Sequence, residues 1–294
     1  MRMIKRPFDI WKVAPYMVVI PCMAVYFYFF YYAAMRGFTY SLTDWNGISQ
    51  SYQFVGLKNY VDAFNSTTLW STIHFTLLFT VIVIVLTNLF SIALALLLDK
   101  NIRCRGLFRG IFFLPAVMSS LTIAYVFQQI DYRLLTQIGS KLGIRTLANG
   151  LLADPAYAPV YVSLVQVWLS TALTTVIYLA GLQAIPGDLL ESARIDGANN
   201  WTLFYRIKLP LIMPAIIINL INTTRTAISS FDIIMGTTQG GPNYATYSFA
   251  MYMYLMYSDL ELAYSCAIAM IMFLLFGAIA LAQIVILRKR EVEM

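Results

Sequence analysis

Charged residues are scarce in this chain. Aspartate, glutamate, lysine and arginine make up 12% of its 294 residues, about half of the roughly 25% found in soluble domains. The chain also has a single histidine, His74, and three cysteines, Cys22, Cys104 and Cys266, that lie far apart. The low charge argues against a soluble domain. A lone histidine, best explained as a helix-end residue, and scattered thiols predict neither a metal site nor a disulfide framework.

Motifs for nucleotide binding and for common hydrolases are missing as well. The chain contains no G-x-x-x-x-G-K-[ST], H-E-x-x-H or G-x-S-x-G motif, so we expect it neither to bind ATP nor to hold a metal or another cofactor. Its net charge is +6, but no basic patch with interleaved aromatic residues accompanies that charge. We therefore do not expect nucleic-acid binding.

Long runs without charge are what the chain has instead. Five of these runs reach the length of about 20 apolar residues that a membrane-spanning helix needs, and a sixth is interrupted only by Arg225. They predict an all-α polytopic membrane protein, a single permease-like domain over 1–294. Its six transmembrane helices are expected at roughly 13–35, 70–98, 107–130, 157–184, 209–231 and 262–288.

The segments between these runs carry weaker signals. Leu57, Tyr60, Val61 and Phe64 are spaced i, i+3, i+4, i+7 and predict a short amphipathic helix on the outer membrane surface. We expect 131–154 to be an irregular outer loop.

Two stretches that contain proline or glycine interrupt predicted helices. Pro115 should kink the helix at 107–130, since it removes one backbone hydrogen bond. The uncharged run 233–258 contains the turn cluster Gln239–Asn243, so only 244–257 can be helical. That length suits a re-entrant or interfacial helix better than a span.

The distribution of lysine and arginine predicts the orientation of the chain. Fourteen of the 20 fall on the face that would carry both termini, and five fall on the opposite face. The positive-inside rule places that face, and with it the segment 186–208, in the cytoplasm. The fourteen residues are Arg2, Lys5, Arg6, Lys12, Lys100, Arg103, Arg105, Arg109, Arg194, Arg206, Lys208, Arg288, Lys289 and Arg290.

Two consecutive predicted spans carry stripes of polar side chains. A stripe across a membrane must face protein or water, because lipid cannot satisfy its hydrogen-bonding groups. Interhelical packing and a polar pathway both remain open, and two stripes on consecutive helices favour the pathway. In 209–231 the stripe covers an arc of about 100° and consists of Asn219, Asn222, Thr223, Thr226 and Ser230; in 157–184 it consists of Ser163, Gln166, Ser170 and Thr174.

Arg225 lies about 24 Å along its helix and to one side of the stripe, at 1.5 Å per residue. Near the outer interface its side chain can reach water cheaply. Binding of an anionic substrate remains the alternative.

The segment 186–208 looks like a soluble fragment between two apolar ones. Pro186 suits a helix start, and acidic residues follow it near the positive end of that helix. Gly197 allows a sharp turn, and Asn199 or Asn200 can cap a second short helix. We therefore expect a cytoplasmic helix–turn–helix rather than a plain connector.

Two motifs in this segment resemble a known family. E-S-A-x-x-D-G-A at 191–198 and F-x-x-I-x-L-P at 204–210 resemble the EAA motif of binding-protein-dependent ABC importer permeases, with Ser192 where that family often has alanine. Three further stretches resemble the carbohydrate-uptake members of that family, and among these the larger subunit of the maltose permeases. They are S-L-T-D-W-N-G, F-V-G-L-K-N-Y and G-G-P-N-Y-A-T.

The resemblance implies a permease in a bacterial cell membrane with four kinds of partner. These are a second, similar permease chain, two subunits that bind ATP and Mg on the cytoplasmic side, an extracytoplasmic solute-binding protein, and a carbohydrate. The ATPase contact would be a coupling helix that includes Glu191, Ser192, Ala193, Asp196, Gly197 and Ala198.

Sugar contacts in the family map onto six positions here, Ser170, Leu173, Thr223, Thr226, Ala227 and Ser230, to which the polar stripes add Thr174, Asn219 and Asn222. Where the maltose protein has an aromatic ring and asparagines, this chain has threonine, alanine and serine, which argues against maltose itself. A secondary transporter or channel of another family is the main alternative. An integral-membrane enzyme is a further one, although no acidic residue falls inside a predicted span.

Overall fold

The computed structural model describes residues 10–100, 103 and 105–288. Within these ranges the chain is helical apart from its connecting loops and one isolated β-bridge between Thr43 and Phe54. Several residues used above lie outside the described ranges, namely Arg2, Lys5, Arg6, Cys104, Lys289 and Arg290.

The first half of the chain forms α1 (Ile10–Tyr26), the π-helical η1 (Phe27–Tyr32), α2 (Ala33–Ser41), α3 (Lys58–Asn65), α4 (Thr67–Asp99), α5 (Arg105–Val117), α6 (Ser120–Gln129), η2 (Ile130–Leu135), α7 (Thr136–Leu142) and α8 (Arg145–Ala148). The second half forms α9 (Ala158–Gln183), α10 (Gly187–Ile195), α11 (Asn200–Thr202), η3 (Leu203–Lys208), α12 (Leu209–Leu211), α13 (Met213–Ile228), α14 (Asp232–Thr237), α15 (Phe249–Ser258) and α16 (Leu262–Arg288).

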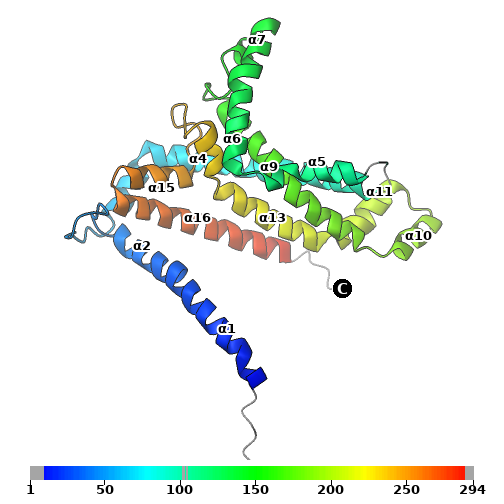
Figure 1. Ribbon diagram of the computed structural model, residues 1–294, viewed down its shortest axis with the longest axis horizontal. Helices are drawn as coiled ribbons and strands as arrows, with labels where there is room; N and C mark the ends of the chain where they lie inside the picture. Colours follow the sequence, from blue (N-terminus) through cyan, green and yellow to red (C-terminus); the bar gives the residue numbers. More distant parts are fainter. Residues whose placement is uncertain (1–9, 101–102, 104, 289–294) are drawn as a thin grey trace, which may run out of the picture.

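Long apolar helices make up the bundle. Helices α4, α5, α9, α13 and α16 lie alongside one another, with α10 and α11 at one end and α15 at the other (Figure 1). Four helices are long and apolar enough to cross a membrane, at 19–41, 67–99, 158–183 and 262–286, and the number rises to six if each of two bent pairs is one span. The all-α polytopic fold is confirmed, whereas the count of six spans stays a prediction.

The helix predicted at 107–130 with a kink at Pro115 is broken rather than kinked. The chain breaks between α5 and α6, and the two helical segments meet at 100°. Pro115 has no N–H to donate to the preceding turn, and Ser119 then takes an extended backbone with ψ 133°. As a result α6 and α7 project from the side of the bundle (Figure 1).

The prediction of an irregular loop at 131–154 is also wrong. Helix continues through η2 and α7 to Leu142 and ends at Gly143, whose φ is +68°. The reason is the fully buried Asp131, whose carboxylate accepts backbone hydrogen bonds from Leu151 (2.9 Å) and Leu152 (3.0 Å). This carboxylate folds the returning chain back onto the helix, and a sequence pattern could not reveal that contact.

The predicted helix at 209–231 is divided into two helices, α12 and α13. Residues 200–211 and 213–228 meet at 68°, at Ile212, two residues before Pro214 in the first turn of α13. Helix α13 then ends at Ile228, three residues earlier than predicted, and α14 begins at Asp232. The amphipathic helix around Tyr60 and the turn cluster at Gln239–Asn243 are confirmed as α3 and as the loop before α15.

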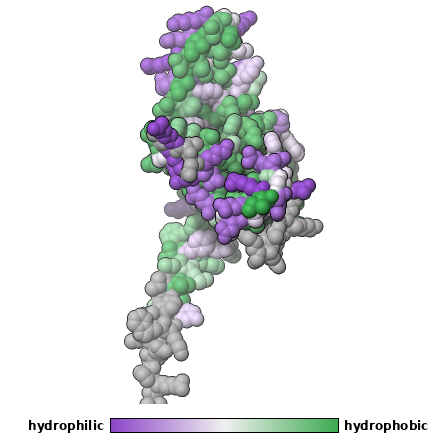
Figure 2. Space-filling view, turned by 90° about the vertical axis from the view of Figure 1, so that its right-hand side faces the viewer, coloured by the Kyte–Doolittle hydropathy of each residue, from purple (hydrophilic) through white to green (hydrophobic). Residues whose placement is uncertain are grey.

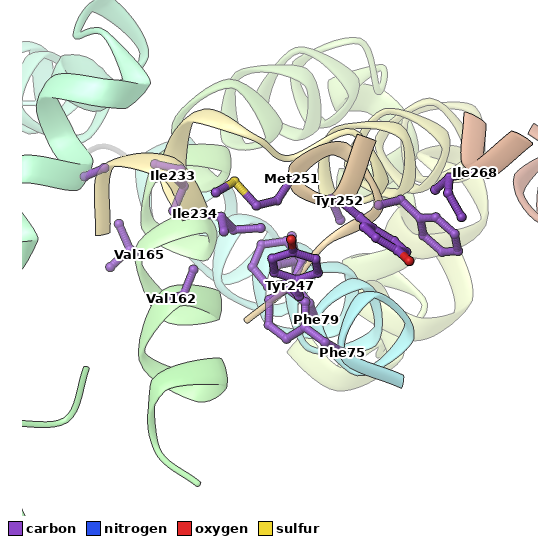
Figure 3. Close-up of a cluster of buried hydrophobic side chains, with 14 of the residues drawn as sticks. Phe75, Phe79, Val162, Val165, Ile233, Ile234, Tyr247, Met251, Tyr252 and Ile268 are labelled. Carbon is purple, nitrogen blue, oxygen red and sulfur yellow. The ribbon is translucent and has the colours of Figure 1, made fainter. Parts of the chain in front are cut away.

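The main hydrophobic core joins α4, α9, α14, α15 and α16. Its buried side chains include Phe75, Phe79, Val162, Val165, Ile233, Ile234, Tyr247, Met251, Tyr252 and Ile268 (Figure 3). A second cluster lies nearer α10 and joins α4, α9 and α13. One close approach fixes the crossing of α6 with α14: a Cβ added to Gly236 would lie 2.6 Å from the Cβ of Ala124 and 3.0 Å from Leu121 Cδ1.

This crossing gives a prediction about stability. We expect Gly236→Ala to destabilise the protein by about 1–3 kcal/mol, because the two helices must move apart to accept the methyl group. The matched control is Gly277→Ala in α16, where nothing lies within 4 Å of an added Cβ. Thermal unfolding in detergent should show a lower Tm for the first variant alone; equal Tm values would contradict the close packing of α6 on α14.

Candidate functional site

A polar cavity of about 470 Å³ lies where α13 ends and α14 begins. Helix α9 and the first residue of α6 complete its wall. We call this space the central cavity. Its lining residues are Ser120, Gln166, Leu169, Leu173, Asn222, Arg225, Thr226, Ser229, Ser230, Phe231, Asp232 and Ile233.

Several polar side chains in the central cavity form no hydrogen bond or ion pair within the described part of the protein. The side chains of Asn222, Arg225, Thr226 and Asp232 are exposed and make no hydrogen bond or ion pair with another described residue. They offer an amide, a guanidinium, a hydroxyl and a carboxylate to a ligand. Phe231 adds an aromatic ring to the same wall.

One buried glutamine holds the wall in place. Gln166 of α9 is 3% exposed; its amide nitrogen donates to Ser170 Oγ at 2.9 Å, and its amide oxygen accepts from Ser230 Oγ at 3.2 Å. Ser230 lies just beyond the end of α13, so this pair of bonds ties α9 to the break between α13 and α14. Because its nitrogen and its oxygen are both hydrogen-bonded, the Gln166 amide is held in one orientation.

The structure separates the predicted pathway residues into two groups. Leu173, Asn222, Thr226 and Ser230 line the central cavity. Thr174, Asn219, Thr223 and Ala227 are buried between helices, and Ser170 is half-buried next to Gln166.

The buried group forms hydrogen bonds that hold helices together. Asn219 Nδ2 donates to the carbonyl of Thr174 at 3.1 Å, and Asn88 of α4 donates to Thr223 Oγ1 at 3.2 Å. Asn88 in turn accepts from the hydroxyl of Tyr178 at 2.6 Å. One edge of the polar stripe on α13 thus makes interhelical contacts, and only the other edge reaches open space.

Seven lining residues of the central cavity were not among the predicted stripe or pathway residues, although Arg225 was considered as an anion-binding alternative: Ser120, Leu169, Arg225, Ser229, Phe231, Asp232 and Ile233. Asn222, Arg225, Thr226 and Ser229 are spaced i, i+3, i+4, i+7, which is itself one helical face and could have identified Arg225 and Ser229. The predicted arc was centred on the neighbouring edge, so Arg225 looked peripheral. Phe231 and Asp232 could not be placed, because the end of α13 at Ile228 was not foreseen.

The segment 186–208 forms the predicted helix–turn–helix at one end of the bundle. Gly197, with φ +84°, turns the chain after α10, and Asn199 Oδ1 caps the next helix by accepting from the backbone N–H of Thr202 at 2.8 Å. Of the predicted coupling residues, Glu191, Ser192, Asp196 and Gly197 are exposed, and Ala193 and Ala198 are half-buried. Figure 2, viewed toward this end, shows hydrophilic surface gathered there.

Both ends of this segment are attached to cavity helices. Helix α10 follows α9 after only Ala184–Pro186, and η3 runs through α12 into α13. Lys208 Nζ lies 3.4 Å from Asp99 Oδ2 at the end of α4. With its amide oxygen turned toward α5, Gln183 accepts from the guanidinium groups of Arg105 (2.9 Å) and Arg109 (2.8 Å). The segment is therefore connected directly to α9, α13 and the end of α4, whereas Gln183 ties the end of α9 to α5.

Comparison with known proteins gives consistent matches. The family described as the binding-protein-dependent transport system inner membrane component matches residues 87–291. The multiple sugar-binding transport system permease protein MsmF of Streptococcus mutans is 34% identical over 265 residues, 90% of this chain and 91% of that protein. The probable starch degradation products transport system permease protein AmyD of Thermoanaerobacterium thermosulfurigenes is 34% identical over 259 residues, 88% of each chain.

A solved structure shares the fold. The bacterial ABC transporter involved in the import of the acidic polysaccharide alginate has a chain that superposes with a TM-score of 0.80 at 21% identity, covering 96% of this chain and 97% of that one. The family match extends over more than half of the chain, and its relatives align over almost its whole length. The chain therefore belongs to the family of inner-membrane components of binding-protein-dependent transport systems.

Proposed function

We propose that this chain is the membrane-spanning permease subunit of an ABC importer and moves a carbohydrate across the membrane. The observation that carries the proposal is the connection of one exposed segment, Gly187–Lys208, to both α9 and α13, which line the central cavity. The family membership and the sugar-transport relatives support it. The proposal assigns no covalent chemistry to the chain; ATP and Mg belong to partner subunits.

The mechanism follows from how the segment is attached. A force applied to α10 displaces the ends of α9 and α13 together, because only short connections join them. The walls of the central cavity then shift as rigid bodies, and packed helices change between discrete arrangements rather than deforming gradually. The cavity can in this way open first to one side of the membrane and then to the other.

The lining of the central cavity suits a carbohydrate. Sugar hydroxyls donate and accept hydrogen bonds, and Asn222, Thr226 and Ser229 provide partners of both kinds. Leu173 and the ring of Phe231 provide apolar surface for the C–H face of a sugar ring. Arg225 and Asp232 have opposite charges, so the lining has no net formal charge.

The proposed assembly has four further components. A second, homologous permease chain completes the translocation path, and two ATP-binding subunits dock at the coupling residues of α10. An extracytoplasmic solute-binding protein delivers the sugar. The positive-inside distribution supports an orientation with both termini and α10 on the cytoplasmic side of a bacterial plasma or inner membrane.

The first prediction concerns the coupling segment. Glu191→Ala and Gly197→Val should each lower ATP-driven sugar uptake at least tenfold in proteoliposomes that contain the complete transporter. The Glu191 side chain is exposed and forms no hydrogen bond or ion pair with a described residue, so we expect its removal to leave the fold intact. Valine at Gly197 meets no neighbour within 4 Å but disfavours the required φ of +84° by about 1–2 kcal/mol.

The matched control for the coupling variants is Glu261→Ala, which removes an exposed carboxylate at the opposite end of the bundle. It should leave uptake unchanged. If uptake by the Glu191 variant is unaffected and follows an ion gradient instead of ATP, the chain is a secondary transporter and the proposal fails.

A second prediction concerns the central cavity. Asn222→Ala and Thr226→Val should each raise the KM for sugar uptake about five- to tenfold, the effect of losing one hydrogen bond of about 1 kcal/mol. The control is Thr39→Val, whose hydroxyl bonds to a carbonyl of its own helix and lines no part of this cavity. Uptake kinetics of a tritiated sugar measure the effect, and a KM unchanged in both cavity variants would exclude these side chains from the path.

A further inference from the structure

A second polar cavity, of about 610 Å³, lies at the end of the molecule opposite to α10, under the loop between α14 and α15. Its wall includes Thr68 at the start of α4, whereas α10 lies near the other end of that helix, where Asp99 pairs with Lys208. We call it the outer cavity. Its polar and aromatic lining consists of Gln239, Asn243, Tyr244, Tyr247, Tyr252 and Asp259.

The lining has a particular chemical character. Three tyrosine rings come together, with centroids 5.2 Å apart for Tyr244 and Tyr247 and 5.5 Å apart for Tyr247 and Tyr252. Two side-chain amides and one carboxylate join them, and no lysine or arginine lines the space. Aromatic faces accept the C–H surface of a ring, and amides and carboxylates bond to hydroxyls. A neutral, hydroxyl-rich ring fits this set, whereas a second carboxylate would be repelled by Asp259.

One hydroxyl at the outer cavity makes no hydrogen bond to a described residue. Tyr247 is 5% exposed, yet its hydroxyl hydrogen-bonds to no other described residue, while the neighbouring Tyr252 hydroxyl lies 3.0 Å from that of Tyr264. Figure 3 shows the Tyr247 ring beside Phe79 with its hydroxyl turned away from it. A phenol hydroxyl both donates and accepts hydrogen bonds, so it can bond to a ligand that enters the outer cavity.

The Tyr247 phenol is suited to donate that bond. Burial, with smaller effects of Tyr244, Tyr252 and Asp259, raises the pKa of Tyr247 to about 12. The hydroxyl therefore keeps its proton at neutral pH. The ring itself is fixed by Gly240, where an added Cβ would lie 2.5 Å from Tyr247 Cδ2.

The loop over the outer cavity is held in an unfavourable backbone conformation. Gln239, Asn243 and Tyr244 have φ values of 53°, 49° and 60°, in the left-handed region that side chains other than glycine seldom adopt. Paired hydroxyls of Thr238 and Thr246, 2.7 Å apart, keep the loop closed. Such conformations persist where the surroundings impose them, and they gather at ligand-binding positions. All three strained residues line this cavity.

From these observations we infer that the outer cavity binds a neutral saccharide unit, as a station that precedes the central cavity. The inference rests on the proposed function, because it takes the transported solute to be a sugar. It assigns Tyr247 as the hydrogen-bond donor and Tyr244 as the exposed stacking surface.

The decisive variant is Tyr247→Phe, which removes one hydroxyl and keeps the ring against Gly240. Since that hydroxyl bonds to no described residue, a purely structural role predicts no change in binding. We expect the purified, complete transporter without its binding protein to bind maltose, sucrose or lactose in saturation-transfer NMR, and the variant to bind about five- to tenfold more weakly with an unchanged Tm. Galacturonate should give no signal.

The matched control is Tyr257→Phe, an exposed tyrosine of α15 that does not line the cavity, and it should bind like the unmodified transporter. The inference is overturned if none of the three sugars binds, or if Tyr247→Phe binds them equally well. It is also overturned if the variant loses affinity only for the binding protein, since a protein side chain would then occupy the cavity. These outcomes are separate from failure of the proposed function, which would appear as absent ATP-driven uptake whatever the binding assay gives.

Discussion

The need to satisfy every backbone N–H and C=O group away from water determines this structure. In lipid a chain can break its helix only where protein or enclosed water replaces the lost hydrogen bonds. The break between α13 and α14 meets this condition: Ser248 Oγ donates to the carbonyl of Ser230 at 3.1 Å, and Gln166 accepts from the Ser230 hydroxyl. The same break creates the central cavity, so the constraint that limits the fold also locates its polar space.

The polar residues buried between helices and those that line the cavity have different roles. Hydrogen bonds of Asn88, Asn219 and Tyr178 run between helices and hold α4, α9 and α13 together. Asn222, Arg225 and Thr226 lie on the adjoining face of α13 and line the central cavity. A translocation path needs both, because walls that move must stay rigid while the surface between them stays polar.

Sequence reasoning recovered the features that depend on local chemistry. The uncharged runs predicted the long helices, and Gly197 and Asn199 predicted the turn and the helix cap. The motif at 191–198 indicated the family. Sequence reasoning failed where distant contacts decide. The single carboxylate of Asp131 holds the returning chain against a helix where an irregular loop was expected, and the predicted kink near Pro115 is a break with an angle of 100°. Periodicity located the stripe on α13 but could not tell which edge faces a neighbouring helix.

The central claim is that α10 controls which side of the membrane the central cavity faces. Labelling of a single cysteine at Ser229, in a chain whose native cysteines have been replaced, by a membrane-impermeant maleimide tests it most directly. The complete transporter in proteoliposomes should be labelled from one side without ATP and from the other when ATP is bound. Glu191→Ala should abolish the difference. Labelling from the same side in every state would contradict the account.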